Sequence, residues 1–549
     1  MRAKWGFLIE NWSRYQKVLE LILNKKGVLA EDVVYYDKQL QGKDAQMEHG
    51  NGFTQQLATA ERIELANQIL DRAWDDVRPL LLRALCAFLA SPISPNGYYE
   101  LEKLLLVVLR GFGRSILEAL LNSLESPTSQ QMPHDLMLNG AGYRVLRDKT
   151  ANRYVATLFG TLCLMRRGYR YWHAGVAESV VFPLELSLGL VESVSPALQE
   201  RIGHEMAEAG ATQNRVLQWL KSEHGVSMGV KRLRELIAKT SQRMSEFQPE
   251  VQLEQLLAAL KTANESKGNR KPVVSVGRDG ITLCEYHSRF YEVAAVATVS
   301  VFDRAGNRLT TVYLAHTPEP HQVTLSKMLS ELLIALLFRW EGPLPQLAYV
   351  ADSGGNESTY FETTLRHMIH PRTGKQLHWQ RVVDYYHAAE RIWTMAECLF
   401  GSGTQKGHAW AHRMLKNLKK SSGASRVLHS AGTMRTRRKM SASALKKFNT
   451  ACNYIRKRTK YMQYDFYKAR HIPLGSGITE AACKTVFTQR LKLSGMRWTS
   501  AGAKNILNLR TCLLSKSWEA TFEKYLNSLN PISMAPYQPK SKSRAKIAA

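Results

Sequence analysis

Three acidic residues stand where elements of secondary structure are predicted to begin or end. Asp279 and Asp352 each end an apolar run that is typical of a buried strand, and Glu480 lies in the first turn of a predicted helix. Mg²⁺ prefers oxygen ligands and keeps several waters, so a few carboxylates are enough to hold it. Carboxylates that converge on metal ions about 3.5–4 Å apart support in-line phosphoryl transfer. We therefore expect a Mg²⁺ site here, with Mn²⁺ as the alternative metal.

Each of these acids also has a structural interpretation. The pair Asp279-Gly280 is a strong signal for a hairpin turn, and Asp352 before Ser-Gly-Gly can cap the end of a strand. Glu480 can complement a helix N-terminus and pair with Lys484 four residues later. Against this last interpretation, Glu480 is one of only four acids in the final 149 residues.

A fourth acid competes with Asp352 for a place in the site. Asp384 stands near the end of another predicted strand, and His387 follows it by three residues. His387 can approach Asp384 or a phosphate, although a lone histidine is more often structural. We expect Asp384 and His387 to support the site.

The predicted elements place these acids on one sheet. From Lys271 onward the pattern gives three strands, then helix, strand, helix, strand and helix, which is the order of an RNase H-like sheet. In such a sheet the acids come from the first strand, the adjacent fourth strand and a late helix. The expected strands cover 272–278, 290–302, 308–315, 347–352 and 378–385, and the expected helices cover 323–340, 357–369 and 386–400.

The positive charge is concentrated at the C-terminal end. The chain carries a net charge of +28, and residues 401–549 hold 30 basic and 4 acidic residues. Arg413–Arg470 contains 17 basic residues and a single acid, Asp465, and aromatic residues are interspersed among the basic ones. A folded surface of this composition favours nucleic acid as the partner.

A second nucleic-acid signal lies upstream. Helices predicted at 195–209, 212–224 and 228–239, the last with Ser227 as its N-cap, have the outline of a helix-turn-helix. Lys231, Arg232 and Arg234 lie on the third helix, which is the one that would enter a major groove. A plain helical bundle is the alternative.

We therefore expect a multidomain fold: an α-helical N-terminal region with a helix-turn-helix, followed by an α/β RNase H-like catalytic domain that a basic helical insertion interrupts. The expected parts are a helical extension at 1–125, a small β-rich module at 140–190, the helix-turn-helix at 195–250, the catalytic domain at 271–400 and 471–515, the insertion at 401–470 and a disordered basic tail at 530–549. The 7 cysteines include no C-x-x-C pair, and the longest apolar runs are too short to span a bilayer. We expect a cytoplasmic protein at the nucleoid, with no signal peptide and no membrane partner.

The block Pro473–Lys484, continued by Gln489–Trp498 and Ala503–Leu509, resembles the C-terminal signature of Kra-type bacterial insertion-sequence transposases, which are DDE enzymes. The likeness covers about residues 140–520 and is most specific over 473–498. It implies the DDE roles for Asp279, Asp352 and Glu480. Such proteins often carry a Cys-pair ribbon where this chain has Tyr169–Pro183 without cysteine, so we expect no zinc.

The resemblance implies a transposase that binds the terminal inverted repeats of its element, cleaves the DNA and joins the ends to target DNA. We expect a homo-oligomer on double-stranded DNA. A non-enzymatic DNA-binding protein derived from this fold and an RNA-directed nuclease are the alternatives. Trp498 can stack on an unpaired base or pack in the core. The candidate DNA contacts are Lys231, Arg232, Arg234, Arg435, Arg437, Arg438, Lys439, Lys484, Arg490, Arg497 and Trp498.

Overall fold

The structure is a computed structural model that describes most of the chain. The described residues are 59–124, 135–138, 141–150, 152–171, 180–284, 286, 291–352, 354–529 and 534–536. The first half of the expected N-terminal extension, most of the cysteine-free stretch at 169–183 and most of the basic tail lie outside these residues. Within the tail, Met534–Pro536 forms a short strand, β11.

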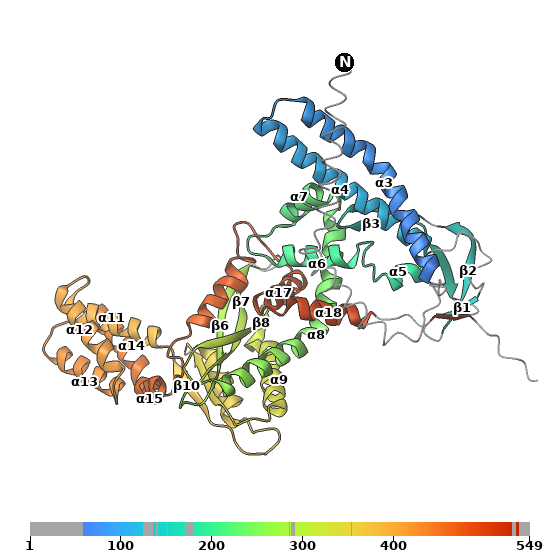
Figure 1. The fold of residues 1–549 in the computed structure, drawn as a ribbon. Helices are drawn as coiled ribbons and strands as arrows, with labels where there is room; N and C mark the ends of the chain where they lie inside the picture. The colour runs from blue at the N-terminus through green and yellow to red at the C-terminus, as the bar shows by residue number, and fades with distance from the viewer. Residues whose placement is uncertain are drawn as a thin grey trace, which may run out of the picture.

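The N-terminal part is a hairpin of two long helices, α3 (Thr59–Ala90) and α4 (Pro95–Ser123), as expected from their apolar spacing (Figure 1). Ser94 caps α4 by accepting a hydrogen bond from the Gly97 amide. The hairpin is followed by small antiparallel sheets. Their strands are β1 (Asp135–Leu138), β2 (Ala141–Thr150), β3 (Arg153–Thr157), β4 (Gly160–Leu164) and β5 (Arg167–Tyr171).

The two β-rich runs of this module, 154–164 and 167–172, do not pair with each other. The first run is itself a hairpin, β3 with β4, because the chain reverses at Leu158–Phe159. Strand β5 instead pairs with β2, in a sheet of order β11-β1-β2-β5.

A short helix, α5 (Pro183–Ser187), precedes the expected helix-turn-helix region. That region contains α6 (Pro196–Ala207), α7 (Gln213–His224) and the first part of α8 (Val230–Glu265). Gly225 ends α7 in the left-handed conformation, as a C-cap glycine does. The third helix was expected to begin after Ser227 and to end near Lys239. In the structure its N-cap is Gly229, and it continues for 36 residues through Pro249.

The central layer is a five-stranded mixed sheet of order β10-β9-β6-β7-β8. Strands β6, β7 and β8 are antiparallel neighbours, whereas β9 and β10 run parallel to β6. The C-terminal half of α8, together with α9 and α10, packs on one face, and α16 and α17 lie on the other, whereas α11 extends from the sheet and packs with the basic helical segment that follows it (Figure 1). The strands are β6 (Val273–Cys284), β7 (Tyr291–Phe302), β8 (Arg308–His316), β9 (Gln346–Ala351) and β10 (Trp379–Val383). The helices and helical turns are η1 (Pro320–Gln322), α9 (Val323–Arg339), α10 (Gly355–Thr363), η2 (Leu365–His367), α11 (Tyr385–Phe400), α16 (Gly477–Ala482), η4 (Cys483–Thr488), α17 (Ser500–Leu514) and α18 (Trp518–Ser528).

Strand β6 is longer than its sequence suggests. The Asp279-Gly280 pair forms no hairpin turn, because these residues pair with Val296 and Ala295 of β7 in the middle of a twelve-residue strand. The turn interpretation is therefore wrong, and so is the expectation that the strand ends at Asp279.

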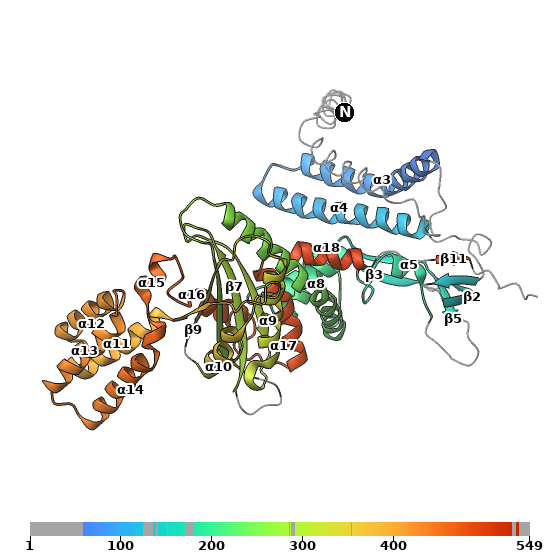
Figure 2. The same cartoon turned by 90° about the horizontal axis from the view of Figure 1, so that it is seen from below.

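The basic segment between α11 and α16 is a helical lobe at the end of the molecule away from α3 and α4 (Figure 2). It consists of α12 (Gln405–Leu418), α13 (Gly423–Thr436), α14 (Ala442–Arg458), η3 (Thr459–Tyr461) and α15 (Tyr464–Ala469). Trp410, Phe448, Tyr464 and Tyr467 are buried in its core. The aromatic residues that seemed to suit a nucleic-acid surface therefore mostly hold the lobe together.

Among the described residues, one helical stretch, Pro320–Arg339, is long and apolar enough to cross a bilayer by length and composition alone. Its residues Leu325, Leu329, Leu333 and Leu336 are buried against the central sheet. This is the packing of a core helix.

Candidate active site

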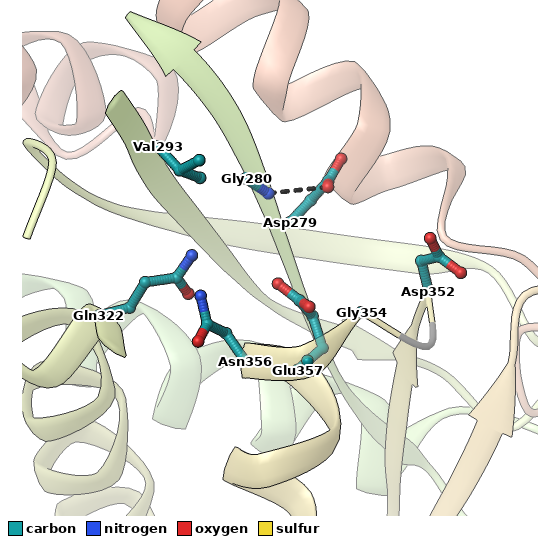
Figure 3. Close-up of a pocket in the computed structure, with 9 residues that line it drawn as sticks. Asp279, Gly280, Val293, Gln322, Asp352, Gly354, Asn356 and Glu357 are labelled. Atoms are coloured by element: carbon teal, nitrogen blue, oxygen red, sulfur yellow. Dashed lines mark hydrogen bonds between the residues drawn. The ribbon is translucent and has the colours of Figure 1, made fainter. Parts of the chain in front are cut away.

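Two of the three predicted acids line one cavity. Asp279 projects from the middle of β6, and Asp352 follows the last residue of β9, the parallel neighbour of β6. The cavity has a volume of about 340 Å³ (Figure 3). Its lining residues are Asp279, Gly280, Val293, Gln322, Asp352, Gly354, Gly355, Asn356 and Glu357.

The third acid, Glu480, is carried by α16, which lies against β6 and β7. Thr479 shares a hydrogen bond of 2.8 Å with Thr298 of β7, and a Cβ atom on Gly277 would lie 1.9 Å from the Thr479 hydroxyl. Only glycine at position 277 allows the helix to approach the sheet this closely. Three residues after Glu480, Cys483 donates a hydrogen bond of 3.3 Å from its Sγ to Oδ2 of Asp279. Glu480 therefore lies on the helix that contacts Asp279, although it does not line the cavity itself.

Asp384 holds two segments together. Its side chain is fully buried, and its Oδ1 accepts hydrogen bonds from the backbone amides of Tyr386 and His387 at the start of α11. Its Oδ2 accepts from the amide and the hydroxyl of Ser476 just before α16. The Ser476 hydroxyl oxygen also lies 2.9 Å from Oε1 of Glu480, so its single proton is shared between the two carboxylates. Asp384 thus positions Glu480 through Ser476 and is not available as a ligand in the cavity.

His387 lies in the first turn of α11, the helix that Asp384 caps, and contacts Glu480 of α16. Its Nε2 is 3.6 Å from Oε1 of Glu480, and its Nδ1 is 3.3 Å from Oε2 of Glu390. Burial lowers the pKa of His387, but Asp352, Glu390 and Asp384 together raise it above its usual value. The structure therefore brings His387 beside the predicted acids.

Glu357, which the sequence analysis did not identify, is the third carboxylate of the cavity. It lies in the first turn of α10 and is 9% exposed. Its carboxylate turns back toward Gly354 at the start of the helix, where it also serves the helix N-terminus. The signal for it was present in the sequence, because an acid follows the Gly354-Gly355 turn only five residues after Asp352.

The cavity concentrates negative charge. Burial raises the pKa of Asp279, the charge of Asp352 raises it further, and hydrogen bonds from Cys483 and the Gly280 amide oppose these effects. Burial likewise raises the pKa of Glu357, and the charges of Asp279 and Asp352 add to this. None of the described residues that line the cavity is a lysine or an arginine. The carboxylates therefore repel one another in an environment that disfavours their charge.

The basic lobe reaches this site through Tyr454 of α14. The Tyr454 hydroxyl donates to Oδ1 of Asp352 at 3.2 Å, across 102 residues of sequence. The guanidinium groups of Arg391 and Arg458 lie 5.1 and 4.1 Å from the centre of the Tyr454 ring. Tyr454 therefore contacts an acid of the cavity, Arg391 of α11 and Arg458 of the lobe.

The donor set of the cavity suits a hard divalent cation. All of its charged donors are carboxylate oxygens, and a cation would relieve their mutual repulsion. As the side chains stand, no group of three or more His, Cys, Asp or Glu within the described residues is arranged to hold a metal ion.

The candidate DNA contacts divide by exposure. Lys231, Arg435, Arg437, Lys439, Lys484 and Arg497 are exposed. Arg232 is half-buried and donates to the backbone oxygens of residues 192–193. Arg234 is exposed but donates to Gln213. Arg438 is exposed but donates to the Leu399 carbonyl.

Arg490 and Trp498 are not among the exposed candidates. Arg490 is 1% exposed and donates from Nε to the Met206 carbonyl, and burial lowers its pKa to about 10. A guanidinium in this position cannot reach a phosphate, so Arg490 leaves the set of candidate contacts. Trp498 is partly buried, donates from Nε1 to the Leu491 carbonyl at 2.8 Å and packs against the core under α17. This packing favours the core interpretation of Trp498.

Comparison with known proteins gives no family for this chain. A scan against protein-family models finds no match, and a search of curated proteins finds none either.

Proposed function

We propose that this protein is a DDE-type DNA transposase with an RNase H-like catalytic domain. One observation carries the proposal: Asp279 and Asp352 meet in one cavity on adjacent parallel strands, and the helix bearing Glu480 packs against Asp279. The strand order β8-β7-β6-β9-β10, antiparallel in its first three strands and parallel in the last two, supports the RNase H-like assignment.

Asp279, Asp352 and Glu480 would hold Mg²⁺ or Mn²⁺, with Glu357 as a further carboxylate. Bound there, the metal would supply charge stabilisation for in-line displacement at a phosphodiester. The chain's own contribution is to fix the acids: Ser476 and Asp384 orient Glu480, Cys483 and the Gly280 amide orient Asp279, and Tyr454 orients Asp352. His387, with its raised pKa, can hold a proton beside Glu480.

Double-stranded DNA is the proposed partner, as terminal inverted repeats and as target. The exposed Arg435 in the last turn of α13, together with Arg437 and Lys439 in the loop that follows it, would neutralise phosphates, and Lys231 at the start of α8 would lie near a groove in a helix-turn-helix. The protein would act as a homo-oligomer at the bacterial nucleoid.

The test is Mg²⁺-dependent nicking of duplexes taken from the DNA that flanks the coding region. Asp279→Asn, Asp352→Asn and Glu480→Gln should each abolish nicking and leave DNA binding within a few-fold of the wild-type value. Asp71→Asn, which removes an exposed acid from α3, is the matched control and should nick normally. Nicking that survives in one of the three variants would remove that acid from the site.

A non-enzymatic DNA-binding protein derived from this fold is the second candidate. The absence of a ready three-donor metal group among the described residues favours it. Wild-type protein that binds the flanking DNA and cuts neither it nor an RNA–DNA hybrid with Mg²⁺ or Mn²⁺ would establish this alternative.

A further inference from the structure

The wall of the cavity that faces the carboxylates carries a glutamine in an unusual setting. Gln322 precedes α9, is 2% exposed and points into the cavity beside Asn356 (Figure 3). Nothing in the proposed two-metal chemistry requires a carboxamide at this place. Its surroundings therefore bear on what the cavity recognises.

The backbone at this position is unfavourable for glutamine. Both His321 (φ 55°, ψ 10°) and Gln322 (φ 52°, ψ 44°) adopt the left-handed conformation, which side chains with a Cβ seldom occupy. Glycine or asparagine would fit it more easily. Strained backbone of this kind persists where the surrounding structure fixes it, and it is concentrated at functional sites.

The side chain of Gln322 does not cap the helix that follows it. Gln322 is the N-cap residue of α9 but makes no side-chain cap hydrogen bond. Glu319 caps the helix instead, because its Oε1 accepts hydrogen bonds from the amides of Thr324 (2.8 Å) and Leu325 (3.1 Å). The need to cap α9 therefore does not explain the glutamine.

Arg278 fixes the orientation of the Gln322 carboxamide. Arg278 is 1% exposed, its guanidinium lies 4.4 Å from the centre of the Tyr360 ring, and its Nη2 donates to Oε1 of Gln322 at 2.8 Å. An arginine can only donate, so the carboxamide oxygen must face it and the NH₂ group must face away. Among the described residues, Nε2 of Gln322 has no hydrogen-bond partner, and it lies 3.5 Å from the place where a Cβ on Gly280 would stand. The cavity thus contains an oriented donor that nothing in the described protein satisfies.

We propose that Nε2 of Gln322 donates a hydrogen bond to an acceptor atom of the DNA strand bound in the acidic cavity, and that Arg278 is the positioning residue for this contact. The inference rests on the proposed function. The phosphates and base edges of a DNA strand in this cavity present hydrogen-bond acceptors. A donor on the wall opposite the carboxylates can therefore bind the strand. The acceptor is a non-bridging phosphate oxygen or the N7 atom of a purine base.

The test couples variants of the protein to modified DNA. Gln322→Asn keeps the charge and suits the left-handed backbone but withdraws the amide by one methylene, and Gln322→Met removes the donor altogether. Affinity for the flanking duplex is measured with Ca²⁺, and nicking with Mg²⁺. One set of duplexes carries single methylphosphonates along the bound strand, and another carries 7-deazapurines. Gln376→Glu, a change at an exposed glutamine away from the cavity, reports on non-specific effects.

Loss of one net hydrogen bond predicts about tenfold weaker binding or slower nicking for both Gln322 variants on unmodified DNA. One modification should cost the wild-type protein about tenfold and cost the variants nothing, and its type identifies the acceptor. Arg278→Lys should weaken this coupling while the melting temperature shows a folded protein. Equal penalties in wild type and variants at every modified position would overturn the proposal.

The proposed function and this inference fail differently. Wild-type protein that binds the duplex without nicking it refutes the transposase chemistry, whereas the affinity coupling still decides the role of Gln322. Wild-type nicking with no coupling refutes the role of Gln322 alone. Wild-type protein that does not bind the duplex refutes both.

Discussion

Replacing Asp384 by asparagine tests how the site is held together. The change keeps the shape of the side chain but turns one acceptor oxygen into an NH₂ group. In the folded protein the two carboxylate oxygens accept four hydrogen bonds, two from the start of α11 and two from Ser476. Asparagine has one carbonyl oxygen, so its side chain can accept either the two hydrogen bonds from α11 or the two from Ser476, but not both pairs. Its NH₂ group then faces the amide of Ser476, which is itself a donor.

The expected cost follows from these contacts. A hydrogen bond to a charged group contributes about 1.5–3 kcal/mol, and a buried donor left without a partner costs about 1–3 kcal/mol. The backbone amide of Ser476 loses its acceptor in a fully buried place, whereas its hydroxyl can rotate toward Glu480. We expect a loss of about 3 kcal/mol in the free energy of unfolding of the sheet domain. At about 2–4 °C per kcal/mol this lowers the melting temperature by about 6–12 °C.

The assay combines calorimetry with nicking. Calorimetry should show a lower melting temperature for the unit that contains the central sheet, with Asp71→Asn as the surface control. Nicking should fall because the start of α16 loses its backbone contact with residue 384 and no longer fixes the position of Glu480, while binding of duplex DNA stays close to wild type. An unchanged melting temperature together with lost nicking would refute this reasoning, since it would make Asp384 a direct participant in the chemistry.

Three further predictions follow from the burial and charge of other residues. Because burial raises the pKa of Asp279 above its ordinary value of 3.8, the ionised carboxyl destabilises the fold fully above the raised pKa and not at all well below 3.8. Asp279→Asn should therefore raise the melting temperature in EDTA at pH 7, with a gain that shrinks toward pH 4; a gain that is the same at both pH values would contradict this. The triple change of Arg435, Arg437 and Lys439 to alanine should reduce the slope of log affinity against log salt by about 3, since each neutralised phosphate contributes about 0.9; an unchanged slope would place the DNA elsewhere. Trp498→Ala should cost about 3 kcal/mol of stability and lower nicking equally on paired and pre-opened DNA ends, because the indole packs on the core and bonds to Leu491; normal melting with a larger loss on paired ends would support base stacking.

The alternation of elements from Lys271 to Phe400 could be predicted closely from the sequence. The apolar runs of β7, β8, β9 and α9 are long and are bounded by turn residues, so their observed limits differ from the expected ones by a residue or two. Helix α10 and strand β6 were the exceptions, because α10 ends at Thr363 and not near residue 369, and β6 continues past Asp279 to Cys284. The local turn preference of Asp279-Gly280 is overridden by backbone pairing with β7 along the whole strand. Pairing with a distant segment is a property that local sequence does not report.

The same limit applies to the residues around the acids. Tyr454, Cys483 and Gln322 reach the site from segments far away in the sequence, and their residue types carry no metal-site signal of their own. The buried state of Arg490 and of the lobe aromatics was hidden for a related reason. Amphipathic helices place basic and aromatic residues close together in the sequence while separating them between surface and core.

The Asp384–Ser476 contact joins residues that are 92 positions apart, and the basic lobe occupies the chain between them. During synthesis the ribosome therefore completes the cavity carboxylates Asp279, Asp352 and Glu357 well before Glu480 emerges. A chain that stops within the lobe would contain Asp279, Asp352 and Glu357 but would lack Glu480 together with α16, α17 and α18, whose apolar residues cover one face of the central sheet. If the protein is a transposase as we propose, a frameshift or early stop in this interval therefore removes both an acid of the site and part of the core that supports it, and the truncated copy is inactive.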